Sequence, residues 1–179
     1  MKKNIMIDCE ASGPCPQFGS LISFGAVVIE PSLDRQYRSP CIRPDCDAFD
    51  PAAYAAIGMS RADHLGNVQC NLADAIASFA GWVANLDADR VVFWSDNPAF
   101  DWQWINHGFA TAGIANPFGH SARRLGDLYA GLERKPANTQ GWKKYRQTPH
   151  DHDPLNDALG NAEAMLAILG KHGMAGWTE

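Results

Sequence analysis

The sequence predicts an α/β domain in which helices cover both faces of a mixed sheet. Three candidate strands come first, at residues 1–10, 19–30 and 36–43, and the second of these segments is rich in β-branched residues. Longer segments with apolar residues at helical spacing follow, and another short apolar run, residues 90–94, lies between two of them. Three strands followed by alternating helices and strands are typical of a layered α/β domain.

The three N-terminal runs are expected to form a three-stranded meander. Residues 1–10 are predicted as a short buried strand, residues 19–30 as a second strand, and residues 36–43 as a third strand beside it. Residues 44–66 contain many turn residues and one short helical stretch, AAYAAIGMS. This region therefore connects the meander to the first long helix.

The second half of the chain is predicted to alternate helices and strands. A helix is expected over residues 71–86, because apolar side chains share one of its faces: Leu72, Ala75, Ile76, Phe79, Trp82, Val83 and Leu86. A buried strand over residues 90–94 and a helix over residues 97–110 follow. A basic stretch, residues 121–150, follows them, and its RRLGDLYA segment is compatible with a further strand. The last helix covers residues 154–169 and ends before a pair of glycines.

Length and composition favour one domain spanning residues 1–179. Hydrophobic residues make up 46% of the chain, which is enough for a packed core. No apolar run approaches the roughly 20 residues of a membrane helix, and the N-terminal apolar segment is too short for a signal peptide. The five cysteines contain no C-x-x-C pair, which favours reduced thiols. We therefore expect a cytoplasmic protein without a membrane partner.

Charge is distributed unevenly along the chain. The net charge is −5, but residues 121–150 contain seven lysines and arginines against two acids. Such a stretch can hold a phosphate backbone beside an acidic site. A solvated, irregular surface segment explains the same pattern equally well, so charge alone leaves both interpretations open.

Two acids lie close together in the first predicted strand. Side chains alternate in direction along a strand, so Asp8 and Glu10 point to one side and Cys9 to the other. Two carboxylates directed into the same space repel each other, and burying them is costly without a cation. The pair therefore suits Mg²⁺ or Mn²⁺, which bind through oxygen. The alternative is a strand end at which both acids meet water.

Two later clusters share the pattern Asx-Pro-x-x-Asp. They occupy residues 97–101 and 153–157, and each ends on an acid, Asp101 or Asp157. Asn or Asp is a good helix N-cap and Pro is favoured at the first helical position, so both clusters are expected to begin helices. The positive end of the helix dipole favours a charged carboxylate there. First-turn acids also occur simply because they stabilise helices.

A histidine precedes the last helix at a useful spacing. His152 lies five residues ahead of Asp157, so its imidazole can approach a metal-bound water while the acid holds the metal. An unperturbed histidine titrates near pH 6.5 and can accept a proton at neutral pH. His150 is two residues away and competes for the same role.

Together the clusters resemble the DEDD-type 3′→5′ exonucleases, the superfamily of polymerase proofreading domains. The residues that match its three motifs are Asp8 and Glu10 (D-x-E), Asn97, Phe100 and Asp101 (N-x-x-F-D), and His152 and Asp157 (H-x-x-x-x-D). Position 153 is Asp and not Tyr, so the chain resembles the histidine branch, DEDDh. The resemblance implies a ribonuclease H-like fold, in which parallel strands extend the meander. The compact length is similar to a stand-alone exoribonuclease branch.

This resemblance also implies a mechanism. Two divalent cations, Mg²⁺ or Mn²⁺, would be bound by Asp8, Glu10, Asp101 and Asp157. His152 would remove a proton from the attacking water, and the product would be a nucleoside 5′-monophosphate. The implied partner is single-stranded nucleic acid or a 3′ overhang, of RNA or DNA. The family often forms dimers, which leaves a homodimer open.

The residues that grip the substrate are less clear in the sequence. Many family members have Thr-Thr-Gly after the motif I Glu, whereas this chain has Ala-Ser-Gly-Pro at residues 11–14. We expect Ser12 to contact the terminal nucleotide, and Lys143, Lys144 and Arg146 to contact the phosphate backbone.

Three other functions fit parts of the pattern. A non-catalytic nucleic-acid-binding module of the same fold would not need all five key residues. A ribonuclease H-like endonuclease would make the H-x-x-x-x-D spacing accidental. An HD-type phosphohydrolase built on residues 150–153 would be all-helical, which the strand pattern disfavours.

Overall fold

A five-stranded mixed sheet forms the centre of the computed structural model, which describes residues 1–178. The strand order is β3-β2-β1-β4-β5. The strands are β1 (Lys2–Ala11), β2 (Leu21–Val28), β3 (Gln36–Arg38), β4 (Arg90–Ser95) and β5 (Ala122–Arg124). The first three form an antiparallel meander, and β4 and β5 extend it in parallel to β1. The predicted α/β architecture is confirmed; the predicted domain ends at residue 179, which lies outside the described residues.

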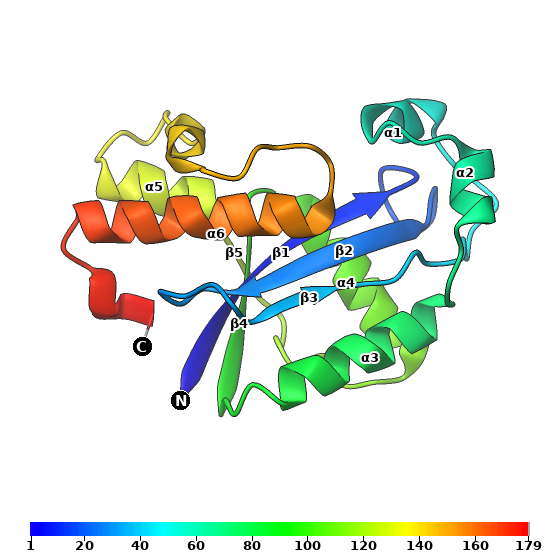
Figure 1. Cartoon of the computed structure of the whole chain (residues 1–179), viewed down its shortest axis with the longest axis horizontal. Helices are drawn as coiled ribbons and strands as arrows, with labels where there is room; N and C mark the ends of the chain where they lie inside the picture. The colour runs from blue at the N-terminus through cyan, green and yellow to red at the C-terminus, as the bar shows by residue number, and fades with distance from the viewer. Residues whose placement is uncertain (179) are drawn as a thin grey trace.

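Helices cover both faces of the sheet (Figure 1). They are α1 (Pro51–Ala56), α2 (Arg61–Gly66), α3 (Leu72–Ala84), α4 (Pro98–Ala112), α5 (Leu125–Leu132) and α6 (Pro154–Lys171), with 3₁₀ helices η1 (Gly141–Tyr145) and η2 (Ala175–Thr178). Helices α3 and α4 enclose one core against the sheet, around Phe24, Phe79 and Trp104. Helices α5 and α6 enclose a second core on the opposite face, around Trp94 and Met165. No helix in the described part of the chain is long and apolar enough to cross a membrane.

Several elements differ from the sequence-based expectation. Strand β3 ends at Arg38 instead of residue 43, because Pro40 lacks the N–H that a regular ladder needs. The single helical stretch expected in residues 44–66 is two helices, because Gly58 breaks the first at a φ of 67° and Ser60 caps the second. The basic stretch contributes the three-residue strand β5 followed directly by helix α5.

The packing of β1 and β2 determines where the acids of β1 point. Ile7 and Cys9 belong to the core under α3 and α4, so Asp8 faces the α6 side of the sheet. Gly25 lies opposite Asp8 on β2. A Cβ atom on Gly25 would lie 2.4 Å from the Leu155 Cα, so only glycine allows the first turn of α6 to rest on the strand. This close approach brings α6 beside the acids of β1.

Candidate active site

Three carboxylates, two from β1 near the N-terminus and one from α6 near the C-terminus, converge at the start of α6. Asp8 and Glu10 come from β1, and Asp157 comes from the first turns of α6. One oxygen from each lies within 4.8 Å of the other two. Asp157 is fully buried and Asp8 is nearly so, whereas Glu10 is partly exposed. The convergence predicted for these three acids is therefore present in the structure.

Asp101 lies deeper, in the first turn of α4. Its side chain is 2% exposed, and its Oδ1 accepts a hydrogen bond of 3.0 Å from the backbone N–H of Cys9 in β1. Its Oδ2 is buried and has no hydrogen-bond partner among the described residues. An unpartnered buried carboxylate oxygen is costly, so this atom needs a cation or a proton.

Both helices that carry acids begin with Pro, as expected from the sequence. The Asp153 side chain caps α6 by accepting from the N–H groups of Leu155 and Asn156, each at 3.1 Å. The Asn97 side chain makes no cap bond, although Pro98 begins α4. Asp101 and Asp157 are thus each held on a rigid helix, and Asp157 also lies near the positive end of the α6 dipole.

Burial and mutual repulsion favour the protonated forms of Asp8, Glu10 and Asp101 when no cation is near. Burial raises the pKa of Asp8 well above its ordinary value, and Asp101 adds the largest repulsion. Burial, with repulsion from Asp157 and Asp101, raises the pKa of Glu10 to about 8. Burial and then Asp96 raise the pKa of Asp101 to about 8. We call Asp8, Glu10, Asp101 and Asp157 the acidic site.

The acidic site fits a hard divalent cation. All of its donors are carboxylate oxygens, the set that Mg²⁺ and Mn²⁺ prefer. Cations would also satisfy the unpartnered oxygen of Asp101, and they would offset the burial and repulsion that raise the pKa values of Asp8 and Glu10.

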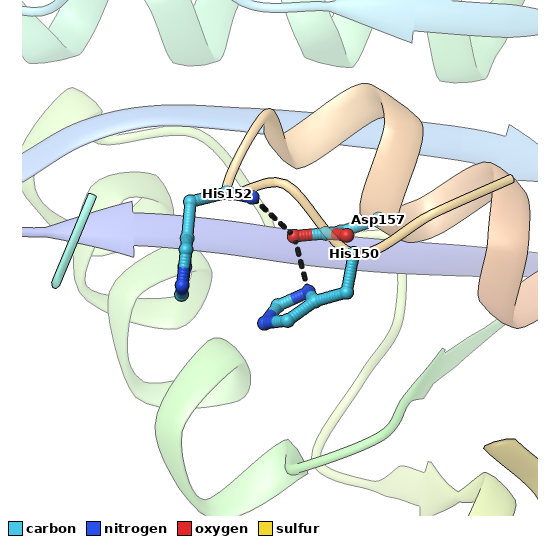
Figure 2. A group of neighbouring side chains, drawn as sticks. All are labelled: His150, His152 and Asp157. Carbon is cyan, nitrogen blue, oxygen red and sulfur yellow. Dashed lines mark hydrogen bonds and ion pairs between the residues drawn. The ribbon is translucent and has the colours of Figure 1, made fainter. Parts of the chain in front are cut away.

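Two histidines stand beside Asp157, on the segment of residues 146–153 that we call the histidine loop. The His150 Nδ1 lies 2.7 Å from Asp157 Oδ2, and the His152 backbone N–H donates to the same oxygen at 3.2 Å (Figure 2). The His152 Nδ1 lies 3.4 Å from Glu10 Oε1. The ring centroids of the two histidines are 4.4 Å apart. Both imidazoles therefore reach the acidic site, and they do so at different acids.

The histidine loop is strained at one position. His152 has a φ of 61°, a left-handed conformation that few non-glycine residues adopt. Such strain costs of order 1–3 kcal/mol and persists only where its surroundings hold it. The hydrogen bond from the His152 N–H to Asp157 is one such restraint. The turn directs the His152 ring to Glu10 while leaving His150 on Asp157.

The chain matches a family model over almost its whole length. The model describes the 3′–5′ exoribonuclease Rv2179c-like domain, and the match covers residues 3–169. The chain is also 33% identical over 181 residues to the 3′–5′ DNA exonuclease Cap18 of Escherichia coli, across 92% of this chain and 90% of Cap18.

The chain belongs to the Rv2179c-like exonuclease family.

Solved structures agree on the fold of this exonuclease. The nuclease domain of 3′hExo, a DEDDh family member solved with rAMP, superposes with a TM-score of 0.74 at 14% identity, across 97% of this chain and 94% of that domain. Exonuclease I of E. coli, solved with a dA16 oligonucleotide, superposes with a TM-score of 0.59 at 14% identity, across 99% of this chain and 43% of that enzyme. The fold is that of the DEDDh, ribonuclease H-like exonucleases. The protein is a 3′→5′ exonuclease, a hydrolase of a family that uses divalent metal ions.

The four residues expected to contact the substrate of this exonuclease lie in different settings. Lys143 and Lys144 are exposed on η1, and Lys143 lines a cavity of about 350 Å³ together with Asp96 and His150. The Ser12 hydroxyl is buried and accepts a hydrogen bond of 2.9 Å from the N–H of Ser20. The Arg146 guanidinium is directed at Asp157, 2.7 Å away, and not at solvent.

Sequence reasoning missed two residues that shape the acidic site, Asp96 and Gly25, and gave a third, Arg146, a different role. Asp96 adds repulsion to Asp8 and Asp101, and it stands directly before the helix-start motif. Gly25 allows α6 to pack closely against the sheet, because a side chain there would clash with the helix. The signal available in the sequence was a glycine inside a run of β-branched residues. The pairing of Arg146 with Asp157 has no signal in the sequence, because an arginine in a basic stretch is typical of an exposed phosphate contact.

Proposed function

We propose that the exonuclease removes single nucleotides from the 3′ end of a single strand of nucleic acid, with two divalent cations held in the acidic site. The observation that carries this proposal is the meeting of Asp8, Glu10 and Asp157 oxygens within 4.8 Å of one another. Asp101 supplies the fourth carboxylate, with one oxygen free of any hydrogen bond in the described chain.

We assign a separate role in the reaction to the bound cations, to His152 and to the two helices that carry acids. When bound, the cations activate water and polarise the scissile phosphate. His152 acts as the general base, because its ring stands 3.4 Å from Glu10 at the exposed edge of the acidic site. The rigid first turns of α4 and α6 hold Asp101 and Asp157, so the carboxylates need little rearrangement. The product is a nucleoside 5′-monophosphate.

We propose Mg²⁺ or Mn²⁺ as the cations. The all-oxygen donor set of the four acids supports both ions, and the two histidines beside Asp157 make Zn²⁺ the ion to compare with them. Activity restored to chelator-treated protein by Mg²⁺ or Mn²⁺, and compared with Zn²⁺, tests this choice.

The substrate proposal is a single strand with a free 3′ end or a 3′ overhang. Complexes of E. coli Exonuclease I with dA16 and dT13 oligonucleotides support single-strand binding on this fold. The family description names an exoribonuclease and the relative Cap18 is named a DNA exonuclease, so both sugars belong in the test. The exposed Lys143 and Lys144 supply cationic contacts beside the cavity near His150.

The decisive experiment follows labelled strands. A 5′-labelled RNA or DNA strand should shorten in steps of one nucleotide from its 3′ end, and a circular strand of the same sequence should stay intact. Matched single strands, duplexes and 3′ overhangs rank the substrates. Cleavage of the circle would show an endonuclease, and binding without cleavage in the presence of Mn²⁺ would show a non-catalytic module.

We also propose a cytoplasmic location and a homodimer. Five free cysteines support a reducing compartment, and the family resemblance alone supports the dimer. Fractionation of cells and sedimentation of the purified chain test the two proposals separately.

A further inference from the structure

Arg146 is enclosed although it lies in the most basic part of the chain. Its side chain is 11% exposed. The guanidinium donates to Asp157 Oδ1 at 2.7 Å and to Asn161 Oδ1 at 3.0 Å, both on α6. It also donates to the carbonyl oxygens of Thr148 at 3.3 Å and Pro149 at 3.2 Å. Four of its five N–H groups are thus used inside the protein, which leaves little for a phosphate.

Helix α6 makes room for this guanidinium at Gly160. A Cβ atom there would lie 2.6 Å from the Arg146 Nε and 2.7 Å from the Thr148 carbonyl oxygen. Contacts that short do not occur for real Cβ atoms, and one of them is to backbone, which cannot simply rotate away. Glycine normally weakens a helix interior, so its place in α6 is explained by the arginine that lies across it.

A second contact fastens the same loop to α6. The Glu163 carboxylate accepts from the N–H groups of Gln147 at 2.9 Å and Thr148 at 2.7 Å, and from the Thr148 hydroxyl at 2.9 Å. Arg146 and Glu163 therefore hold the start of the histidine loop against the helix that carries Asp157. His150 and His152 follow within a few residues, so their positions depend on this attachment.

We propose that Arg146 is a positioning residue of the exonuclease site, which orients Asp157 and holds the histidine loop, and that position 160 is glycine to admit it. The catalytic part of this inference rests on the proposed function of the acidic site and His152. Arg146 reaches the reaction only through Asp157 and the loop. Lys cannot replace Arg146, because a single ammonium group cannot donate to the four acceptors that surround the planar guanidinium.

Two substitutions test the proposal from opposite sides. Arg146→Lys keeps the positive charge and removes the planar donor set. Gly160→Ala leaves every charge in place and displaces the guanidinium. Gly170→Ala is the matched control, because it lies on the same helix and a Cβ atom there meets nothing within 4 Å. Circular dichroism and thermal unfolding confirm that each variant is folded.

Kinetics then separate positioning from phosphate binding. Loss of a residue that orients a metal ligand typically costs 10–100-fold in activity or metal affinity. We expect Arg146→Lys and Gly160→Ala each to lower kcat by at least about tenfold, with KM and the dependence of binding on salt unchanged. Lys143→Ala should instead raise KM and reduce the slope of log affinity against log salt by about 0.7, as one phosphate contact does on a single strand.

Metal affinity gives a measurement independent of cleavage. Thermal unfolding titrated with Mn²⁺ should show affinity reduced by about 10–100-fold in Arg146→Lys and Gly160→Ala, and unchanged in Gly170→Ala. Wild-type kcat and Mn²⁺ affinity in Arg146→Lys would overturn the proposal, as would a reduced salt slope in that variant. Should the wild-type chain cleave no strand, the proposed function fails, while the Mn²⁺ titration still decides the role of Arg146.

Discussion

Asp101 is the acid that we expect to depend most on the proposed cations. It is buried, one of its oxygens accepts from the Cys9 N–H, and the other has no partner in the described chain. Its pKa of about 8 means that the folded protein keeps this acid protonated where the unfolded chain has lost the proton. Without a cation, Asp101 therefore lowers stability at neutral pH, which agrees with the proposal that it serves as a metal ligand.

The first prediction concerns Asp101→Asn. The amide can keep the hydrogen bond to Cys9 and never ionises, so the metal-free variant should melt a few degrees above the wild type near pH 8. The difference should become small below about pH 4, as the Asp101 carboxyl becomes protonated in the unfolded chain as well as in the folded one. Cleavage should fall at least about 100-fold. Calorimetry and 3′-end assays measure both effects, and a variant that melts below the wild type near pH 8 would contradict this account.

The second prediction separates the two histidines. His152→Ala should lower kcat by about 10²–10⁴-fold, the usual contribution of a general base. His150→Ala should have a smaller effect, because His150 faces Asp157 and not Glu10. Single-turnover cleavage of a labelled strand measures both. A wild-type rate in His152→Ala would transfer the role of base to His150.

At the scale of elements, the site depends on how closely α6 approaches β2. Hydrophobic periodicity and helix-start signals predicted β1, β2, α3, β4, α4 and α6, because each is decided by its local sequence. The three-residue strands β3 and β5 and the 3₁₀ helix η1 depend on tertiary neighbours, so local patterns define them poorly. Gly25 belongs to the same class, since its importance appears only when Leu155 lies against it.

The third prediction concerns Gly25→Ala. The added Cβ would meet the Leu155 backbone at 2.4 Å, so α6 must move away from Asp8. Overpacking of this kind costs about 1–3 kcal/mol, or a fall in Tm of several degrees, and cleavage should fall with it. Gly81→Ala on α3 is the control, because nothing lies within 4 Å of its Cβ position. Equal stability and activity in the two variants would contradict the proposed approach.

At the scale of the whole molecule, the residues of the three motifs lie together in the structure, whereas the basic residues do not. The five motif residues, Asp8, Glu10, Asp101, His152 and Asp157, gather around one end of α6 although they span most of the chain. The role of the basic stretch, residues 121–150, was ambiguous in the sequence because its lysine and arginine side chains make different contacts in the structure. Lys143 and Lys144 are exposed, Arg146 is paired with Asp157, and Arg124 donates to the Asp96 carbonyl oxygen. Only a structure distinguishes an exposed side chain that can contact phosphate from one that forms an ion pair or hydrogen bond inside the protein.

The fourth prediction concerns the stability of the whole protein against pH. Glu10 and Asp101 have folded pKa values of about 8, above their ordinary values of 4.5 and 3.8. The folded chain then binds more protons than the unfolded chain. The contribution of these two acids to the stability of the metal-free protein is therefore greatest below about pH 4, and it is lost as the pH rises towards about 8. Mn²⁺ should reduce this loss by replacing the protons. Melting curves with and without chelator measure it, and identical pH profiles would contradict it.

In the proposed function, four acids from three elements, β1, α4 and α6, together hold two divalent cations. Calorimetric titration of the full chain with Mn²⁺ tests it most directly. We expect two ions per chain for the wild type and the loss of at least one in Asp157→Asn and in Asp8→Asn. No binding at millimolar Mn²⁺, or unchanged binding in both variants, would contradict it.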